Sequence, residues 1–339
     1  MRSVGQLADR ETLKRLYSEK PAFSEQTLVA IFNKHRLGRL EQFVPLGGNV
    51  MNAVYDIRLE GGQAAILKIQ VKPFGATDLE HRLIGQFRSS TTLPVSSWSI
   101  LDTACDVCPY PYVIFSKLPG QSAREMFEGS DSEIRQQLSR GLGRIVGAIH
   151  SQKIPDYDYL GDDRLSQCRA VLEATFLKDV AFHAEIMACV PSFCPRLAGL
   201  LESMALSAVE EEAVLLWKDP VFHNMLVEKD GQQIRVSGIY DFQFSSIGSR
   251  AFDLIYVEGD FGQRAPREVY GDPAYFQSFK DGYEGSSGCR YEINESHRAL
   301  WNVLSYAREV RNWWDWGRVL HPKTPAFLDM LLNSLSKLS

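Results

Sequence analysis

The hydrophobic and polar positions of this chain follow two different periods. Within residues 55–59 apolar and polar side chains alternate, and residues 64–69 are almost continuously apolar. Both patterns predict strands, and the Gly-Gly pair between them predicts a hairpin turn. Farther along the chain, apolar residues recur every three or four positions, as they do on one face of a helix. The order predicts an N-terminal part rich in strands and a C-terminal part rich in helices.

Three segments carry the helical spacing. Residues 25–37 form the first predicted helix, with the serine before it as its cap, and residues 78–87 form the second, with one buried face. The third predicted helix covers residues 134–150 and follows a capping box at residues 130–133. We interpret His150, at the end of this helix, as a structural residue and not as a catalytic base.

A second hairpin is predicted near the middle of the C-terminal part. Residues 225–228 and 234–240 are strand-like runs, and an Asp-Gly turn lies between them. A hairpin places its two outer ends side by side, so we expect Asn224, which enters it, to lie near Asp241, which leaves it. Asp219 lies on the loop that leads from a short apolar strand into this hairpin.

These three polar residues have the composition of a phosphoryl-transfer centre. Kinases use an Asp to accept the proton of the substrate hydroxyl, and an Asn and a second Asp to hold magnesium on the triphosphate. Magnesium takes few protein oxygens and keeps positions for water and phosphate. Asp and Asn are also common turn residues, so the segment taken alone fits an ordinary surface loop equally well.

The rest of the chain favours the kinase interpretation. The segment resembles the catalytic core of the aminoglycoside phosphotransferase and choline kinase group, small-molecule kinases that share the protein-kinase fold. The group's pattern is H-G-D, four residues, N, then I-D-W or similar, then G-D-P-x-x-D. Five polar or glycine positions match: Asp219, Asn224, Asp241, Gly248 and Asp253.

The chain departs from this pattern at two positions. Trp217 replaces the histidine, which in the family supports the loop, and Lys218 replaces the glycine. Lys218 could lower the proton affinity of Asp219 or reach a phosphate. The interpretation we prefer is a plain lysine that faces solvent.

The resemblance covers about residues 43–260 and implies a fold class and a domain organisation. We expect an α+β, bilobal protein-kinase-like fold, with a small antiparallel-sheet N-lobe and a larger, mainly helical C-lobe. The predicted nucleotide-binding lobe covers residues 1–117, including the N-terminal helix. A hinge follows at residues 118–120, and the catalytic and acceptor-binding lobe covers residues 121–339.

The resemblance also implies six nucleotide-binding residues: Gly47, Gly48, Lys68, Glu80, Ser116 and Leu118. The glycines would let backbone N–H groups approach a phosphate. The lysine would contact the phosphates and be oriented by the glutamate. The last two residues follow a buried strand and would bond to adenine through their backbone. The glycine turn differs from the family pattern, because three residues instead of two separate its second glycine from the following Asn52.

The implied activity is transfer of the γ-phosphate of ATP (or GTP), with Mg²⁺, to a hydroxyl of a small molecule. Asp219 would accept or orient the hydroxyl proton, Asn224 and Asp241 would hold magnesium, and Asp253 would brace the loop. An aminoglycoside or amino sugar is the acceptor we expect. Kinases for choline, a methylthio-sugar or homoserine share every residue named, and Trp217 and the altered glycine turn leave a nucleotide-binding pseudokinase as an alternative.

Charge is unevenly distributed over the 339 residues. Residues 1–120 carry 14 basic and 11 acidic side chains, which leaves 23 basic and 31 acidic side chains for the remainder. An acidic C-terminal lobe would attract a cationic acceptor, although mild acidity serves solubility equally well. It argues against nucleic acid as a partner, because nucleic acid requires a basic surface. The sequence does not determine the oligomeric state.

Composition predicts a soluble protein. Apolar residues make up 45% of the chain and charged residues 23%, and no run approaches the roughly 20 apolar residues of a membrane span. The N-terminus lacks the apolar core of a secretory signal, so we expect a cytoplasmic protein without membrane partners. Six cysteines do not make a disulfide framework in a chain of this size, and we expect free thiols and not a zinc site at Cys105 and Cys108. Trp313, Trp314 and Trp316 are expected in the core, with an acceptor pocket as the alternative.

Overall fold

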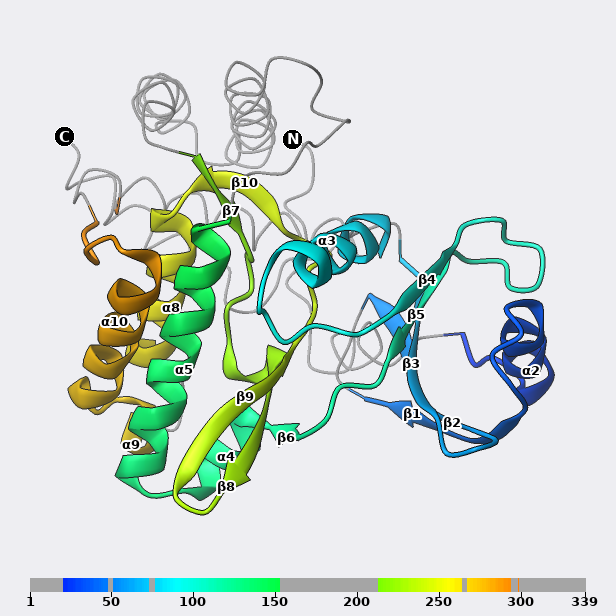
Figure 1. Ribbon diagram of the computed structural model, residues 1–339, viewed down its shortest axis with the longest axis horizontal. Coiled ribbons are helices and arrows are strands. Elements are labelled where there is room, and N and C mark those ends of the chain that lie inside the picture. The colour runs from blue at the N-terminus through cyan, green and yellow to red at the C-terminus, as the bar shows by residue number, and fades with distance from the viewer. Residues whose placement is uncertain are drawn as a thin grey trace, which may run out of the picture.

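The computed structural model of the protein describes residues 21–47, 51–72, 77–152, 213–263, 267–293 and 298. Figure 1 shows a β-sheet with two helices at one end of the molecule and a mainly helical region at the other. We refer to the sheet with helices α2 and α3 as the N-terminal lobe, and to the elements from β6 onward as the C-terminal lobe. Three of the six cysteines (Cys168, Cys189 and Cys194) and the tryptophans expected in the core near the C-terminus lie outside the described residues.

The N-terminal lobe contains a five-stranded antiparallel sheet with the order β1-β2-β3-β5-β4. Its strands are β1 (Leu40–Leu46), β2 (Asn52–Leu59), β3 (Ala64–Gln70), β4 (Ser99–Asp102) and β5 (Tyr112–Ser116). The predicted hairpin between β2 and β3 is confirmed. The central strand β3 carries Lys68, which pairs with Val54 on one side and Val113 on the other.

Alternation along β3 separates a core face from a polar face. Ala65, Leu67 and Ile69 pack into a core with helix α2 (Glu25–Lys34), so the residues between them, including Lys68, lie on the opposite face. Helix α2 begins at the predicted serine cap but ends three residues before the predicted end. Arg36 has a φ of +53°, a left-handed conformation that cannot continue a helix.

Helix α3 (Thr77–Ser90) crosses the face of the sheet that carries Lys68 (Figure 1). Its predicted apolar side is confirmed, because Leu83 and Phe87 are buried together with Val113 and Phe115 of strand β5. Glu80 lies one turn from Leu83 and is also buried, on the side that faces Lys68.

The C-terminal lobe combines a β-hairpin with packed helices. The hairpin pairs β8 with β9 as predicted, β6 adds to β8, and β7 pairs with β10. The elements are β6 (Gln121–Ser122), α4 (Ala123–Gly129), α5 (Ser132–His150), β7 (Ala213–Leu216), the 3₁₀ turn η1 (Phe222–Asn224), β8 (Met225–Asp230), β9 (Gln233–Ile239), β10 (Ser246–Ser249), α8 (Ala251–Gln263), α9 (Arg267–Tyr270) and α10 (Pro273–Ser287).

The cap of helix α5 lies one residue later than predicted. The Asp131 carboxylate accepts a hydrogen bond from the backbone N–H of Ile134 at 3.0 Å. Ser130 is instead the C-cap residue of the preceding helix α4. The capping box predicted from Ser130 is therefore wrong by one position, and the helix itself is confirmed over its apolar stripe.

One continuous hydrophobic cluster joins the two lobes. It runs from Val113 and Phe115 of the sheet, through Phe87 of α3, to the buried faces of α5 and α10. Among the described helices, none is long and apolar enough to span a membrane.

Helices α5 and α10 approach so closely that they leave no room for a side chain at Gly143. A Cβ built there would lie 2.1 Å from the carbonyl oxygen of Phe279. We predict that Gly143→Ala lowers the free energy of unfolding by about 1–3 kcal/mol, because the helices must move apart. Gly285 lies on the exposed side of α10, and no atom lies within 4 Å of the position that its Cβ would take. Gly285→Ala should raise the free energy of unfolding by about 0.5–1 kcal/mol, because alanine has the higher helix propensity. Urea denaturation measures both, and equal effects at the two positions would contradict the packing argument.

Candidate active site

The loop after strand β7 is anchored by a buried carboxylate. Asp253, on helix α8, is fully buried and accepts the backbone N–H groups of Trp217 at 2.8 Å and Lys218 at 3.0 Å. The Nε2 atom of His150 lies 3.2 Å from the same carboxylate. These contacts confirm the predicted brace at Asp253 and the structural interpretation of His150.

Trp217 supports the loop where the family pattern has histidine. Its indole N–H donates to the backbone carbonyl of Tyr240 at 3.2 Å, and its ring stacks on Phe242 with centroids 5.6 Å apart. Tyr240 and Phe242 flank Asp241. The indole therefore ties the loop that carries Asp219 to the segment that carries Asp241, and the replacement of histidine leaves the loop supported.

Lys218 is half-buried and its ammonium contacts an aromatic ring, so the interpretation of a plain solvent-facing lysine is wrong. Its ammonium lies 3.8 Å from the centroid of the Phe252 ring, a cation–π contact. Its backbone has a φ of +74°, the left-handed conformation in which glycine has no steric penalty. The glycine of the family pattern fits this conformation, and here a lysine adopts it while its side chain lies over an aromatic ring.

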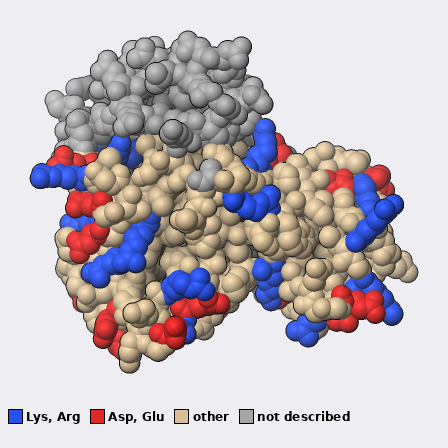
Figure 2. Space-filling model, viewed as in Figure 1, with Lys and Arg blue, Asp and Glu red and all other residues tan. Residues whose placement is uncertain are grey.

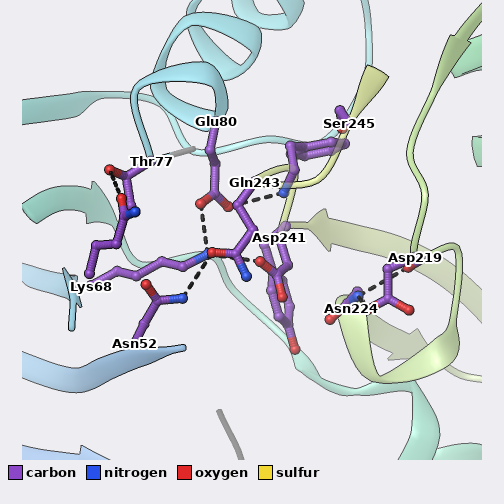
Figure 3. A network of polar contacts seen from close by, with 12 residues as sticks. Asn52, Lys68, Thr77, Glu80, Asp219, Asn224, Asp241, Gln243 and Ser245 are labelled. Carbon is purple, nitrogen blue, oxygen red and sulfur yellow. Dashed lines mark hydrogen bonds and ion pairs between the residues drawn. The ribbon is translucent and has the colours of Figure 1, made fainter. Parts of the chain in front are cut away.

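Both carboxylate oxygens of Asp219 have hydrogen-bond donors. Asn224 Nδ2 donates to Oδ2 at 2.8 Å, and the Tyr256 hydroxyl donates to Oδ1 at 2.9 Å (Figure 3 shows the Asn224 contact). His223 Nε2 lies 3.7 Å from Oδ2. Burial alone would raise the pKa of Asp219, but His223, Asn224 and Tyr256 outweigh burial, and the pKa lies below its ordinary value. The carboxylate is ionised at neutral pH.

Asn224 and Asp241 lie at neighbouring ends of the β8–β9 hairpin, as the sequence predicts. Met225 pairs with Ile239, and the backbone N–H of Tyr240 donates to the Asn224 carbonyl at 3.2 Å. The Asn224 amide turns its nitrogen toward Asp219, so its oxygen points the opposite way. An amide oxygen and the Asp241 carboxylate are hard donors that suit Mg²⁺, which retains several waters.

Lys68 joins strand β3, helix α3 and the segment after β9. Its ammonium lies 2.7 Å from Glu80 Oε2 and 2.8 Å from Asp241 Oδ1 (Figure 3). Burial opposes the charge on this ammonium, but the carboxylates of Asp241 and Glu80 outweigh burial and raise the pKa of Lys68. The structure thus brings Lys68 and Glu80 together with Asp241, which lies 173 positions after Lys68.

The predicted glycine turn is described only in part. Gly47 is exposed, and no atom lies within 4 Å of the position that a Cβ would take there, whereas Gly48 lies outside the described residues. Beside this turn, Val44 and Leu46 of strand β1 are exposed by 45% and 40%. Leu46 pairs with Val54, which in turn pairs with Lys68, so Leu46 lies on the face of the sheet that carries Lys68. These exposed apolar side chains offer a surface for a flat base.

The segment after strand β5 is held on both sides. The Ser116 backbone N–H donates to Trp98, and its carbonyl accepts from the Ser96 hydroxyl, both at 3.0 Å. Leu118 lies against Gly238 of the β8–β9 hairpin. Gly120 has a φ of +102°, and a Cβ there would lie 2.6 Å from the Val227 carbonyl. The segment therefore crosses between the lobes in close contact with the hairpin. The domain boundaries and the base-binding roles of Ser116 and Leu118 stay predictions.

Sequence reasoning missed several polar residues of the site. Tyr256 and His223 contact Asp219, and Gln243 bonds to Asn52. Tyr256 lies three positions after Asp253, so helical spacing places both on one side of α8 and could have identified it. The contact of Gln243 with Asn52 joins residues 191 positions apart, and no local signal predicts it.

The cysteines of the described region do not form a metal site. Cys105 is an exposed free thiol and Cys108 a buried one. Within the part of the chain that the structure describes, no group of three or more His, Cys, Asp and Glu side chains is arranged to hold a metal. Mg²⁺ does not require such a group, because Asn224 and one carboxylate suffice beside phosphate and water.

The comparison of this chain with models of protein families agrees with the fold and with the geometry of the site. The model of the phosphotransferase enzyme family matches residues 42–288. The chain belongs to this family. It is a small-molecule phosphotransferase with the kinase-like fold that the sequence predicts. No curated protein matches this phosphotransferase in sequence.

Solved structures of low sequence identity share the fold. A candidate aminoglycoside phosphotransferase from Ralstonia eutropha aligns with a TM-score of 0.60 and 15% identity, over 93% of this chain and 99% of its own. The GDP and kanamycin complex of APH(2'')-IIIa gives 0.60 and 13%, over 91% and 97%. Macrolide 2'-phosphotransferase MphH from Brachybacterium faecium gives 0.55 and 18%, over 88% and 98%.

The left-handed backbone at Lys218 leads to a stability prediction. The left-handed conformation costs a residue with a Cβ roughly 1–2 kcal/mol of conformational free energy, and glycine has no such cost. We predict that the free energy of unfolding, measured by denaturant titration, is about 1 kcal/mol higher for Lys218→Gly than for Lys218→Ala. Both variants lose the contact with Phe252, and only glycine relieves the strain of the left-handed backbone. Gly129→Ala, at the C-terminal end of α4 with open space around it, serves as the control for the general effect of Gly versus Ala. Equal stability of the two Lys218 variants would contradict the strain argument.

Proposed function

We propose that this phosphotransferase transfers the γ-phosphoryl group of ATP (or GTP), with Mg²⁺, to a hydroxyl group of a cationic small molecule. An aminoglycoside or related amino sugar is the acceptor class we favour. The observation that carries the proposal is the ionised Asp219 carboxylate, oriented by Asn224 and Tyr256, beside a hairpin whose other end holds Asp241 against Lys68.

The nucleotide is assigned to the side of the site that Lys68 occupies. Its ammonium, buried and held by Glu80, would bind phosphate oxygens, and the turn at Gly47 and Gly48 would offer backbone N–H groups to them. The backbone of Leu118 would bond to the base, and Ser116 would contribute only its carbonyl, because its N–H donates to Trp98. Structures of the same fold support a nucleotide here, because APH(2'')-IIIa was solved with GDP and APH(4)-Ia with AMP-PNP and hygromycin B.

The divalent cation is assigned to Asn224 and Asp241. When bound, Mg²⁺ would neutralise charge on the triphosphate. In the structure, Lys68 donates to Asp241 Oδ1, which leaves Oδ2 for a ligand on the side away from the lysine. The donor set of one carboxylate and one amide oxygen fits a cation that keeps part of its water shell.

Asp219 would act on the acceptor hydroxyl. The carboxylate accepts the hydroxyl hydrogen, which turns an oxygen lone pair toward the γ-phosphorus. As the new O–P bond forms, the bond to the β-phosphate oxygen breaks, the hydroxyl proton passes to Asp219, and the nucleoside diphosphate leaves. A carboxylate with a lowered pKa is a weak base, so its contribution is mainly orientation, as in other phosphoryl transfers that depend on positioning.

The acceptor class has indirect support. Enzymes of the same fold were solved with kanamycin, gentamicin and hygromycin B. On the face shown in Figure 2, the molecule is hollowed between the two lobes, and acidic and basic side chains are mixed over the larger lobe. The acidic balance of the C-terminal sequence therefore does not form a single acidic patch on this face, and the acceptor is best identified by experiment.

Replacement of Asp219 tests the reaction. We predict that Asp219→Ala lowers turnover at least about 100-fold while nucleotide affinity changes little, because this carboxylate contacts the acceptor and not the nucleotide. Release of nucleoside diphosphate is measured with a panel of aminoglycosides, macrolides, choline, homoserine and methylthio-sugars. Asp230→Ala, in the exposed turn of the same hairpin, is the control. Nucleotide binding without turnover of any acceptor would favour a pseudokinase, and turnover of only another acceptor would exclude the amino-sugar assignment.

Tyr256 is predicted to orient Asp219. Tyr256→Phe removes the hydroxyl that donates to Oδ1, and we expect kcat to fall about tenfold, the value of one hydrogen bond to a charged group, with an unchanged KM for nucleotide. Tyr291→Phe is the matched control, because its hydroxyl bonds to the Leu254 carbonyl of the same helix without contacting Asp219. A fall of the same size in both variants would show a general effect on α8.

A further inference from the structure

Three buried polar side chains from three helices meet beside the loop that carries Asp219. Tyr283 belongs to α10, His150 is the last residue of α5, and Asp253 lies in the first turn of α8. The Tyr283 hydroxyl lies 3.2 Å from His150 Nδ1, and His150 Nε2 lies 3.2 Å from Asp253 Oδ2. The exposed fractions of the three residues are 0%, 6% and 0%, so both contacts are shielded from water.

Close packing of α5 against α10 determines where Tyr283 lies. A Cβ built at Gly147 would lie 2.7 Å from the Tyr283 carbonyl oxygen, and one built at Gly282 would lie 2.1 Å from the Arg140 carbonyl oxygen. A side chain at either glycine would push the helices apart. The close approach brings the tyrosine ring edge-on to the His150 ring, with centroids 5.6 Å apart.

The groups around the Tyr283 hydroxyl favour one direction for its bond to His150. Burial outweighs the nearby Arg250 guanidinium and raises the pKa of Tyr283 to about 12, so the phenol keeps its hydrogen at neutral pH. Arg250 also bonds to this hydroxyl, and a guanidinium has only donors, so the phenol oxygen is the acceptor there. The Ser287 hydroxyl, which also approaches, donates to the Cys289 carbonyl at 3.2 Å. The arrangement therefore favours donation of the phenol hydrogen to His150 Nδ1.

This direction determines the state of the imidazole. A neutral imidazole has one N–H and one bare nitrogen, so a ring that accepts at Nδ1 carries its hydrogen on Nε2. Nε2 then donates to Asp253. The carboxylate thus accepts from three donors: the imidazole of His150 and the backbone N–H groups of Trp217 and Lys218. The opposite tautomer would turn a bare nitrogen toward the carboxylate oxygen and weaken its hold on the loop.

We propose that Tyr283 is a positioning residue for the proposed phosphoryl transfer. Its hydroxyl holds the His150 imidazole in the tautomer that donates to Asp253, and this carboxylate places the loop that carries Asp219. Lys218, one of the two residues held through the backbone, directly precedes the aspartate and has a φ of +74°. The inference rests on the proposed function, since that function gives Asp219 its role. Phosphoryl transfer depends on positioning, so a small change in this backbone alters the rate.

The kinetic test removes the hydroxyl and keeps the ring. Release of nucleoside diphosphate from ATP or GTP is measured with the acceptor of the panel above that is turned over fastest. Tyr283→Phe should lower kcat about threefold to tenfold, the range of one neutral hydrogen bond, and leave the KM for nucleotide unchanged. Tyr275→Phe is the matched control, because Tyr275 is buried on the same helix and its ring packs on Phe127. Its kcat should stay within about twofold of the wild type.

Two measurements require no turnover. Nitrogen NMR of histidine-labelled wild type should show His150 with its hydrogen on Nε2 and a bare Nδ1, and Tyr283→Phe should lose this single pattern. The backbone N–H groups of Trp217 and Lys218 should exchange with solvent about threefold to tenfold faster in Tyr283→Phe. The N–H of Ile134, which also donates to a carboxylate but at the other end of α5, should exchange at an unchanged rate.

A second substitution separates the imidazole from the tyrosine. The amide nitrogen of a glutamine at position 150 takes the place of Nε2 and is always a donor, so it can hold Asp253 without help from Tyr283. Tyr283→Phe should therefore lower kcat less in a His150→Gln background than in the wild type. Equal effects in the two backgrounds would overturn the proposed chain of contacts.

The outcomes separate this inference from the proposed function. A wild type that turns over no acceptor overturns the proposed function, and with it the kinetic role of Tyr283. A folded Tyr283→Phe that loses stability but keeps its kcat, the imidazole pattern and the amide exchange rates overturns the positioning role and leaves the proposed function standing. If Tyr283→Phe does not fold, the wild-type spectrum decides, because a hydrogen on Nδ1 of His150 overturns the inference.

Discussion

The buried ammonium of Lys68 is the interaction on which the arrangement of the two lobes depends. Its charge lies between carboxylates from helix α3 and from the segment after β9, with 6% of the residue exposed. A buried charge is tolerated only when it is paired, and removal of one partner of such a group costs several kcal/mol. The need to pair this charge determines which face of β3 carries Lys68 and which side of α3 carries Glu80. It also fixes the position of Asp241.

A second buried charge fixes the loop of the C-terminal lobe. Asp253 has no access to solvent and is satisfied by two backbone N–H groups and an imidazole. Because the carboxylate holds backbone atoms, the side chains at positions 217 and 218 are free to differ from the family pattern. At position 217 an indole takes the place of the imidazole and bonds to the carbonyl of Tyr240. At position 218 a lysine side chain lies over the Phe252 ring.

The polar residues of the site are held by different sets of contacts. Asp219 and Asn224 are held by the C-terminal lobe. Asp241 is held from both sides, by Lys68 of the N-terminal lobe and by the bonds that its neighbour Tyr240 makes to Asn224 and Trp217. Phosphoryl transfer depends chiefly on positioning and on charge stabilisation. The positions of these groups therefore depend on contacts from both lobes.

Much of this organisation was predictable from local sequence. The alternation around residues 55–69, the Asp-Gly hairpin and the apolar stripes of α3 and α5 all reflect the periods of strand and helix, which adjacent residues determine. The hairpin also predicted that Asn224 and Asp241 would meet. The ends of elements were less predictable. Arg36 adopts a left-handed conformation after α2, and Ser130 ends α4 instead of capping α5.

The sequence by itself determined the type of each element and the chemical kinds of side chain available for phosphoryl transfer. Only the tertiary structure decided which groups from separate elements contact one another: Gln243 with Asn52, Tyr256 with Asp219, and the Lys218 ammonium with Phe252. The reason is physical. Local periods follow from backbone geometry within a few residues, whereas the pairing of buried polar groups is settled by the exclusion of water when separate elements pack together.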